Sequence, residues 1–546
     1  MIGLLGVNGA LIYIAWKYKQ SHYIFLVLLA MNTFLQAVMI MCLIIHYIFT
    51  RLLCCCLRRK EKIPDRPERI CMVIPCYNET RHELERSLDS LVRQQDLDGH
   101  ARMALIIVDG NVKGKGMEKT TQEHLLDDIL LKSNRTYFRN GYRARDGLFM
   151  ACTVQDGYYK GLPYILIGKR YNQGKRDSLC FIRSFLYHFC NRSQGIETIF
   201  NPKLFDHLAN LLIIHGLNEV DYLVGIDADT VLADDCVSEM VKVIRTDPKL
   251  VGVCGHVCVD FGNRPFGFWE LYQYVEYSLT QGLRRMFQSR ITGRVNCLPG
   301  CCQLLRVDQA TFGDKVLREK FGYVPKPNDG MTKHIMGNYS EDSIHASVIF
   351  SCFPSKRTAQ ALKAKAYTVV PDNWRVFLSQ RKRWSLGSIS NEFVMAWRPG
   401  ILLIERICSI ITCITWFIMP FIIAAFAELI WLLVRKGPKI IDDHVFIGLL
   451  SVLVVRYIYS FLILAWLPSG FFERLQFFVG FFIHLLASPF MNIIIIVYSL
   501  FYSDDFKWGK TREVVEEEDT MEEKRPMNFY RSNTSYYIRR EIDVKE

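Results

Sequence analysis

Long runs of apolar residues occur near both ends of the chain, and a region of mixed polarity lies between them. Residues 24–49 are almost uncharged and long enough to cross a bilayer, and residues 3–16 form a shorter candidate before them. The first run has no basic stretch before it and no small-residue cleavage site, so we do not interpret it as a signal peptide. Further runs that could span a membrane lie at 407–434, 445–467 and 475–502.

Positive charge beside the second run predicts how the protein is oriented. Arg51, Arg58, Arg59 and Lys60 follow this run directly, so the positive-inside rule places its end in the cytosol. We therefore expect a multi-pass protein, of the plasma membrane, whose central domain is cytosolic. The net charge of +12 could also indicate nucleic-acid binding, but no nucleic-acid-binding module is recognisable. Membrane lipids are the expected partner of the basic residues, and nucleic acid is not.

The number of membrane crossings conflicts with the expected side of the C-terminal tail. Three complete crossings would place the tail, residues 503–546, outside the cell, although its charges give no reason to cross. Pro489 lies inside the last apolar run, and proline removes a helical hydrogen bond and clashes with the preceding turn. We therefore expect the run to bend at about Ser488 and Pro489, with its second half returning toward the cytosolic face. The expected parts are transmembrane helices at 1–50, a catalytic domain at 61–370, interfacial helices at 371–400, a transmembrane region at 401–502 and a cytosolic tail at 503–546.

Short apolar runs alternate with amphipathic segments in the central region and predict an α/β fold. Residues 70–75 are typical of a buried strand, residues 81–93 have helical periodicity, and 104–108 and 222–226 are typical of further strands. Acidic residues follow two of these strands, and one of them is Asp109. Because ligands bind at the carboxyl ends of the strands in open, mostly parallel sheets, we expect the binding site at this edge.

Asp227 and Asp229 follow the third strand and are the expected ligands of a divalent cation. A diphosphate leaving group develops negative charge, and a cation held by carboxylates neutralises it. Side chains alternate in direction along an extended Asp-x-Asp, so one acid can reach the metal while the other reaches the sugar or a metal-bound water. The motif is common by chance, and its place after a buried strand is what favours the metal site.

Three more segments carry groups suited to a sugar nucleotide. Residues 172–178 precede a helical pattern at 179–189 and resemble an anion-binding turn that brings Lys175 near the uracil or the phosphates. A second segment holds an acid pair that could supply a general base, although acids are also common in the first turn of any helix. The third has guanidinium groups that can pair with a pyrophosphate and an indole that can stack on a sugar ring. The residues concerned are Glu341 and Asp342 in the second segment and Gln380, Arg383 and Trp384 in the third.

Taken together, these motifs resemble those of chitin synthases, processive family-2 glycosyltransferases with a GT-A-type domain. The similarity extends from about residue 70 to residue 512. The matching segments are VIPCYNE (73–79), VDGNVKGKG (108–116), NQGKRDS (172–178), DADT (227–230), CLPGC (297–301), the ED pair, VPDNWRVFLSQRKRW (370–384) and DDFKWGKTR (504–512).

The resemblance implies transfer of N-acetylglucosamine from UDP-GlcNAc, with inversion, to the non-reducing end of a growing β-1,4-linked chitin chain, and passage of the polymer across the membrane. It implies Mg²⁺ or Mn²⁺ held by Asp227 and Asp229, and a general base at Asp342 with Glu341 beside it. Lys175 is expected beside the uracil or the phosphates. The other implied binding residues are Pro75, Tyr77, Glu79 and Asp109 for the uridine, Cys297, Pro299 and Gly300 for the acceptor sugar, and Gln380, Arg383 and Trp384 for the acceptor and pyrophosphate.

The chain departs from the family pattern around the acid pair. The family usually has Gly-Glu-Asp-Arg, whereas Ser340 and Ser343 flank the pair here, so a cation beside the base is absent. Hyaluronan synthase shares the metal acids, the Gln-x-x-Arg-Trp ending and the spans, but CLPGC and the long 370–384 block favour chitin. A non-processive, lipid-linked sugar transferase would not need the Trp384 motif, and a catalytically silent scaffold would not need the acids. Assembly into a homo-oligomer is a further option.

Overall fold

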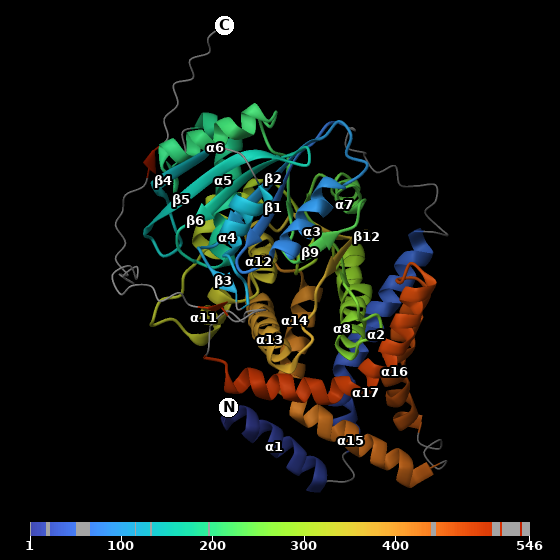
Figure 1. Cartoon of the computed structure of the whole chain (residues 1–546). Helices are drawn as coiled ribbons and strands as arrows, with labels where there is room; N and C mark the ends of the chain where they lie inside the picture. The colour runs from blue at the N-terminus through green and yellow to red at the C-terminus, as the bar shows by residue number, and fades with distance from the viewer. Residues whose placement is uncertain are drawn as a thin grey trace.

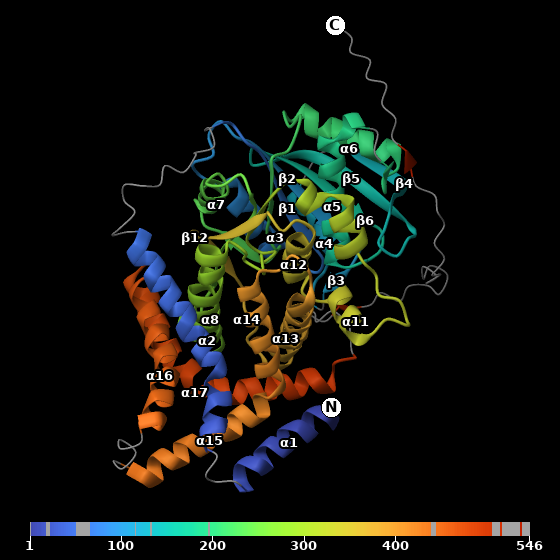
Figure 2. The same cartoon turned by 180° about the vertical axis from the view of Figure 1, so that it is seen from behind.

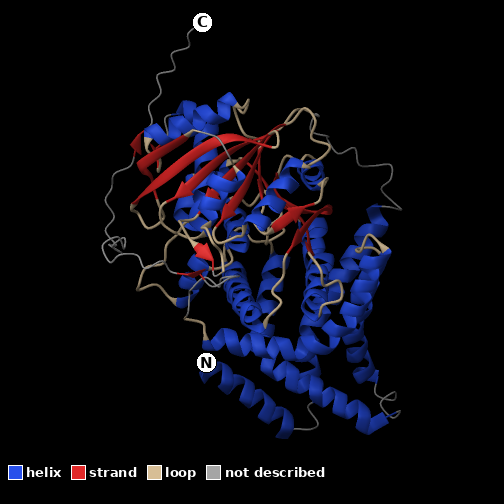
Figure 3. Cartoon of the chain, in the orientation of Figure 1, coloured by secondary structure: helices blue, strands red, loops and turns tan. Residues whose placement is uncertain are grey.

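The computed structural model describes residues 2–17, 22–50, 66–114, 116–130, 134–194, 197–437, 444–504, 514–515 and 536–537. An α/β domain lies at one end of the molecule, and helices from both termini of the chain gather beneath it (Figures 1 and 2). The strands are concentrated in the α/β domain, while the opposite end is helical (Figure 3).

One mixed sheet forms the centre of the α/β domain. Its strand order is β4-β5-β6-β2-β1-β8-β11-β10-β12-β9. The pairings give β4, β6, β2, β1, β8, β10 and β12 one direction and β5, β11 and β9 the other. This confirms the expected α/β class with a mostly parallel sheet. The bounds are β1 Arg69–Cys76, β2 Ala101–Val108, β4 Arg135–Arg143, β5 Phe149–Tyr159, β6 Leu162–Lys169, β8 Tyr222–Gly225, β9 Thr230–Leu232, β10 Leu250–Val259, β11 Gln303–Arg306 and β12 Arg357–Thr368.

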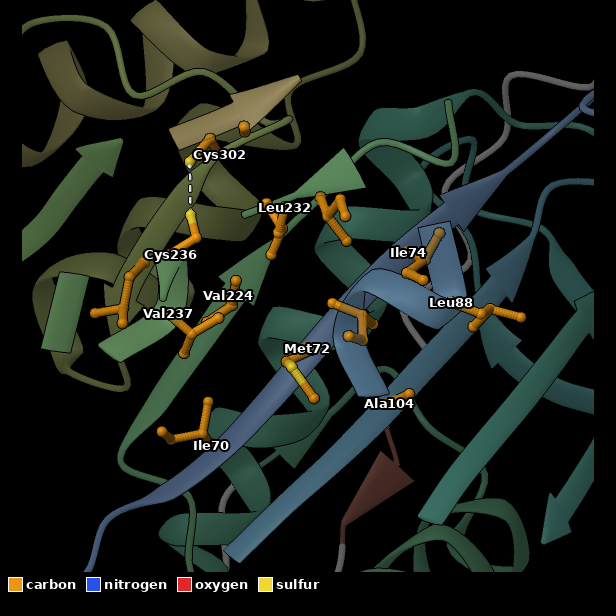
Figure 4. Packing of buried hydrophobic residues seen from close by; sticks show 14 of the residues in the cluster. Ile70, Met72, Ile74, Leu88, Ala104, Val224, Leu232, Cys236, Val237 and Cys302 are labelled. Carbon is orange, nitrogen blue, oxygen red and sulfur yellow. Dashed lines mark hydrogen bonds between the residues drawn. The ribbon is translucent and has the colours of Figure 1, made fainter. Parts of the chain in front are cut away.

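Alternate residues of the central strand β1 enter two separate cores, because successive side chains of a strand point to opposite faces. Ile70, Met72 and Ile74 pack with α3 (Arg81–Val92) and α7 (Cys236–Ile244) on one face (Figure 4). Cys71 and Val73 pack with α5 (Lys175–Cys190) and α6 (Pro202–Ile214) on the other. The strand ends that carry the candidate site are thus held from both faces of the sheet.

The remaining elements of the domain include helices that turn toward the membrane end. They are β3 Lys113–Gly114, α4 Thr121–Glu123, β7 Glu197–Thr198, α8 Phe268–Leu279, α9 Gln309–Phe312, α10 Asp314–Val316, α11 Met331–Asn338, α12 Glu341–Cys352, α13 Trp374–Trp397 and α14 Leu403–Phe417. Helix α3 matches the predicted periodic segment at 81–93, whereas α5 begins four residues before the predicted helix at 179–189. The described cysteines are free thiols, and those of Cys236 and Cys302 lie 3.6 Å apart in the core of Figure 4.

The apolar runs form α1 (Ile2–Lys17), α2 (His22–Ile48), α15 (Met419–Lys436), α16 (His444–Leu462) and α17 (Phe471–Phe501). Among the described residues, Ala30–Ile48 and Phe471–Phe501 are long and apolar enough to cross a membrane. A bent pair, α14 with the first part of α15, would make a third span if the two act as one. The protein is therefore a membrane protein with two to three candidate spans.

The run at 407–434, expected as one span, is broken into α14 and α15, which meet at an angle of 72°. Pro420 lies in the first turn of α15, where a proline is tolerated, but it could not continue α14. Asn8 of α1 compensates for the break, because it donates to the carbonyl of Phe417 at 2.9 Å and accepts from the amide of Phe421 at 3.0 Å. One side chain thus satisfies backbone groups on both sides of the bend, as an apolar environment requires.

The run at 475–502 forms one continuous helix, α17, with Pro489 inside it, so the chain does not leave the helical conformation there. The expected bend at Ser488 and Pro489, and the return of the second half toward the cytosolic face, stay predictions. Beyond α17, two short tail strands pair with the α/β domain: β13 (Val514–Val515) with β3, and β14 (Tyr536–Tyr537) with β7. The described parts of the tail therefore contact the domain that carries the site. The side of the membrane on which the tail lies stays a prediction. Residues 505–513, which hold most of the DDFKWGKTR motif, lie outside the described residues.

Candidate active site

A cavity of about 1020 Å³ lies at the carboxyl ends of β1, β2 and β8 and extends to α13. Each site residue predicted from the sequence lines it. The sequence therefore predicted which residues meet, although their placement together does not assign a role to any of them. These residues are Pro75, Tyr77, Glu79, Asp109, Lys175, Asp227, Asp229, Cys297, Pro299, Gly300, Glu341, Asp342, Gln380, Arg383 and Trp384.

Asp109 is fixed in place at one end of the cavity by a lysine that sequence reasoning missed. Its Oδ1 lies 2.5 Å from Nζ of the fully buried Lys169 and accepts from the amide of Gln173 at 2.9 Å. Lys169 also contacts Asp177 at 3.0 Å, and the two carboxylates raise its pKa against the opposing effect of burial. The signal in the sequence was a charged residue at the end of the buried run 162–169. Acids follow β2 and β8 in the same way.

Glu79 stands beside this end of the cavity as a buried carboxylate. Its Oε2 accepts from the amide of Tyr77 at 2.6 Å. Burial raises the pKa of Glu79 to about 7, and Asp229 adds to the shift. Burial thus favours the neutral form of Glu79 far more than in an exposed carboxyl, which suits a group that forms hydrogen bonds more than one that holds a cation.

Lys175 joins the two acidic motifs of the cavity. Its Nζ lies 2.5 Å from Oδ1 of Asp227 and 3.8 Å from Oε1 of Glu341. Glu341 has a lowered pKa, because Lys175 and then Arg176 outweigh the effect of burial. Among the described residues no ion pair to Asp229 occurs, and burial, followed by the neighbouring charge of Asp227, raises its pKa to about 7. Lys175 thus compensates the charge of Asp227, whereas Asp229 lies in a buried, acidic environment that disfavours its ionised form.

Asp342 points one oxygen at the backbone and leaves the other without a partner. Oδ2 accepts from the amide of Gly300 at 2.9 Å, whereas Oδ1 is buried without a hydrogen-bond partner among the described atoms. A side chain at 300 would crowd this arrangement, since its Cβ would lie 3.0 Å from Lys175 Nζ and 3.2 Å from Asp342 Oδ1. Burial and then the charge of Glu341 raise the pKa of Asp342 to about 7. A carboxylate with these properties is suited to general-base chemistry near neutral pH.

Two arginines of α5 lie close to the acid pair, which Ser343 follows. Arg176 donates to the carbonyl of Met336 at 2.7 Å and to that of Tyr339 at 2.8 Å, and thereby holds the turn that precedes the acids. The Arg183 guanidinium, whose pKa is lowered by burial, is fully buried and close enough for Asp342 and Glu341 to oppose that shift. Sequence reasoning missed both arginines, because they lie more than 150 residues before the acids.

Helix α13 holds Arg381 beside the cavity-lining residues Gln380 and Trp384. Arg381 is a structural residue, since it donates to Glu276 at 2.6 Å, to Gln273 at 3.1 Å and to the side-chain oxygen of Gln380 at 2.6 Å. Its guanidinium lies 4.3 Å from the ring centre of Trp384, whose side chain is 42 % exposed. Arg381 therefore holds the Trp384 ring in position, while Trp384 lines the cavity.

Polar side chains line the cavity where it approaches the apolar helices. Among the lining residues, Arg284 and Gln288 donate to Glu405 behind them at 2.8 and 3.1 Å, and Asn296 donates to Glu392 at 3.0 Å. Sequence reasoning missed this group. Its members come from four separate segments, and their signal was only an acid near the start of an apolar run.

The sequence model of a family described as chitin synthase matches residues 46–144 and 165–541. A chitin synthase 8 of Gibberella zeae is 65% identical over 521 residues, which are 95% of this chain and 78% of that protein. A chitin synthase 8 of Verticillium dahliae is 53% identical over 479 residues, 84% of this chain and 78% of that protein. Among solved structures, the mannosyltransferase PcManGT from Pyrobaculum calidifontis, in complex with GDP-Man and Mn²⁺, aligns over 88% of this chain and 99% of that one with 14% identity and a TM-score of 0.40.

Proposed function

Since the chain belongs to the chitin synthase family and is therefore a UDP-GlcNAc-dependent glycosyltransferase, we propose that its cavity adds N-acetylglucosamine to a β-1,4-linked chain with inversion and that the protein translocates the polymer across the membrane. The observation that carries this proposal is the continuity of the cavity. The strand-end acids, the acid pair at 341–342 and the acceptor helix α13 all line one space. Donor, base and acceptor can therefore meet without a large rearrangement of the fold.

The donor would bind at the strand ends. Asp109, pinned by Lys169 through one oxygen, keeps its other oxygen for the uracil, while Tyr77 and Pro75 border the same end of the cavity. Lys175 then lies between Asp227 and Glu341, where its positive charge can stabilise the negative charge that develops on the leaving diphosphate.

Asp227 and Asp229 would hold Mg²⁺ or Mn²⁺. Two neighbouring carboxylates, one with its pKa raised by burial and by the other, fit a hard divalent cation with oxygen ligands. The described residues hold no cluster of three or more His, Cys, Asp or Glu that could bind a metal. This fits Mg²⁺, which commonly uses one or two carboxylates together with substrate phosphates and water. When bound, such an ion supplies charge neutralisation at the diphosphate.

Asp342 would act as the base in the inverting step. Its Oδ2 is occupied by the Gly300 amide, so Oδ1 is the atom that takes the proton from the acceptor 4-hydroxyl. The acceptor oxygen then attacks C1 of the sugar from the face opposite the diphosphate, which inverts the anomeric centre. Trp384 offers a ring face for the acceptor sugar, and the polar lining formed by Glu392, Arg284 and Gln288 continues from it toward the apolar helices.

The rate of synthesis is expected to rise with pH through about 7. Asp342 acts only when deprotonated, and its pKa is raised to about 7, so kcat should increase about tenfold per pH unit below that value and level off above it. Measuring kcat at saturating UDP-GlcNAc across this range tests the expectation. Because the negative charge of Glu341 contributes to the raised pKa, Glu341→Gln should move the midpoint to lower pH. A midpoint that does not move in this variant would contradict the coupling.

Donor choice and stereochemistry test the proposed reaction. The purified protein in lipid should form polymer from UDP-GlcNAc alone, with β linkages in the NMR spectrum of the product, and added UDP-glucuronate should not be incorporated. Polymer that requires both donors would favour a hyaluronan synthase reaction instead. Retained α linkages would overturn the inverting mechanism.

A further inference from the structure

The turn that carries the acid pair touches the acceptor helix directly. Ser340 immediately precedes the acids, and its φ of 51° and ψ of 45° lie in the left-handed region, which is unfavourable for a residue with a Cβ atom. Such a conformation persists only where the surrounding structure holds it. Figures 1 and 2 show α12, which begins after this turn, at the upper end of α13.

Gly387 of α13 leaves the space that Ser340 fills. A Cβ atom built at 387 would lie 1.9 Å from Ser340 Oγ, 2.6 Å from Ser340 Cβ and 3.3 Å from Tyr339 Cβ. Rotation of the serine hydroxyl would relieve the first contact but not the second, because Cβ is fixed to the backbone. The close approach of helix and turn therefore requires glycine at 387.

The same face of α13 carries Arg383, four residues before Gly387 and thus one helical turn away. Burial lowers the pKa of the Arg383 guanidinium, and the nearby carboxylates of Glu341 and Asp227 oppose that shift. The spacing between helix and turn thus also sets the distance between Arg383 and the acids.

The turn is held from its other side by α5. Arg176 of this helix binds the carbonyls of Met336 and Tyr339 at 2.7 and 2.8 Å. A displacement forced from α13 would therefore act on a turn that is clamped between two helices. The acids that follow it would have to move or rotate.

We propose that Gly387 and Ser340 are a complementary pair of positioning residues, in which the missing side chain of one and the side chain of the other set the separation between the acid pair and the acceptor helix. The proposal rests on the proposed roles of Asp342 and Arg383 in glycosyl transfer. Neither Gly387 nor Ser340 need touch a reacting atom.

Gly387→Ala should lower kcat about ten- to a hundredfold, since a displacement of about 1 Å in reacting groups has effects of that size. The KM for UDP-GlcNAc and the affinity for UDP should stay within about twofold of the wild-type values, because the strand-end half of the cavity is not displaced. Alanine is a better helix former than glycine, so weakening of α13 cannot cause the loss. Gly448→Ala is the matched control, because a Cβ at this helical glycine meets nothing within 4 Å.

Rescue separates positioning from general damage. In the Gly387→Ala protein, Ser340→Gly removes both of the closest atoms, and the third, Tyr339 Cβ, lies at 3.3 Å. This double variant should regain the kcat of Ser340→Gly alone. Ser340→Ala keeps the Cβ at 2.6 Å and should not rescue. If Gly387→Ala does not accumulate, protein yield and kcat are compared between Gly387→Ala with Ser340→Gly and Gly387→Ala with Ser340→Ala. The first should exceed the second in both.

Wild-type kcat in Gly387→Ala, equal rescue by glycine and alanine at 340, or no rescue by either would each overturn the proposal. The proposed function fails in a different way, through polymer synthesis by an Asp342→Asn protein. That result would remove the base assignment, while the pattern of rescue would still decide whether Gly387 and Ser340 are paired.

Discussion

Asp342→Asn is expected to abolish polymer formation while UDP binding remains close to wild type. In the proposed mechanism this residue acts on the acceptor hydroxyl and not on the nucleotide, and its Oδ2 is held by the amide of Gly300. An amide of the same shape cannot take a proton, and loss of a general base typically lowers rates by about 10²- to 10⁴-fold. Polymer synthesis from labelled UDP-GlcNAc and UDP binding by titration, on the same membrane preparation, give the two readouts.

Glu341→Gln is the matched control for this prediction. Glu341 pairs with Lys175 at 3.8 Å and takes no direct part in proton transfer in the proposed mechanism, so its loss should reduce synthesis much less. Equal and mild effects of the two substitutions would contradict the base assignment. They would mean that the acids only stabilise the start of α12.

Asp229→Asn should remove most activity while membrane insertion and protein level stay normal. The substitution takes away one of two carboxylates that would hold the cation, and loss of such charge stabilisation typically costs about 3–4 kcal/mol in the transition state, or about 10²- to 10³-fold in rate. Synthesis rates at several concentrations of Mn²⁺ and Mg²⁺ measure the effect. A weaker dependence on metal should accompany the lower rate.

The same variant also makes a prediction about nucleotide affinity. Metal-supported binding of UDP should weaken in Asp229→Asn, whereas Asp342→Asn should leave it intact. Near-wild-type polymer from Asp229→Asn would contradict the metal assignment. Equal loss of UDP binding in both variants would contradict the division of the cavity into donor and acceptor halves.

The sequence predicted the strand-end site because acids after buried strands have one common explanation, the binding edge of a parallel sheet. It did not predict Lys169 or Arg176, whose partners lie far away in the chain. Lys169 is meaningful only beside Asp109 and Asp177, and Arg176 only beside the carbonyls of Met336 and Tyr339. Such pairings depend on tertiary contacts that no local pattern records.

The membrane helices show the same limit. A proline in an apolar run predicts a break, but the context decides which proline causes one. Pro489 is accommodated within α17, whereas the helix breaks before Pro420. At that second position Asn8, about 410 residues earlier in the chain, supplies the hydrogen bonds that the bend leaves open. Periodicity alone could not have paired these residues.

The central claim is that this cavity synthesises chitin from UDP-GlcNAc. The most direct measurement is digestion of the product that the purified, lipid-reconstituted protein makes from radiolabelled UDP-GlcNAc with a divalent cation. The account predicts an insoluble polymer that chitinase converts completely to short N-acetylglucosamine oligomers, and no polymer from the Asp342→Asn protein. A product that resists chitinase, or equal polymer from Asp342→Asn, would contradict it.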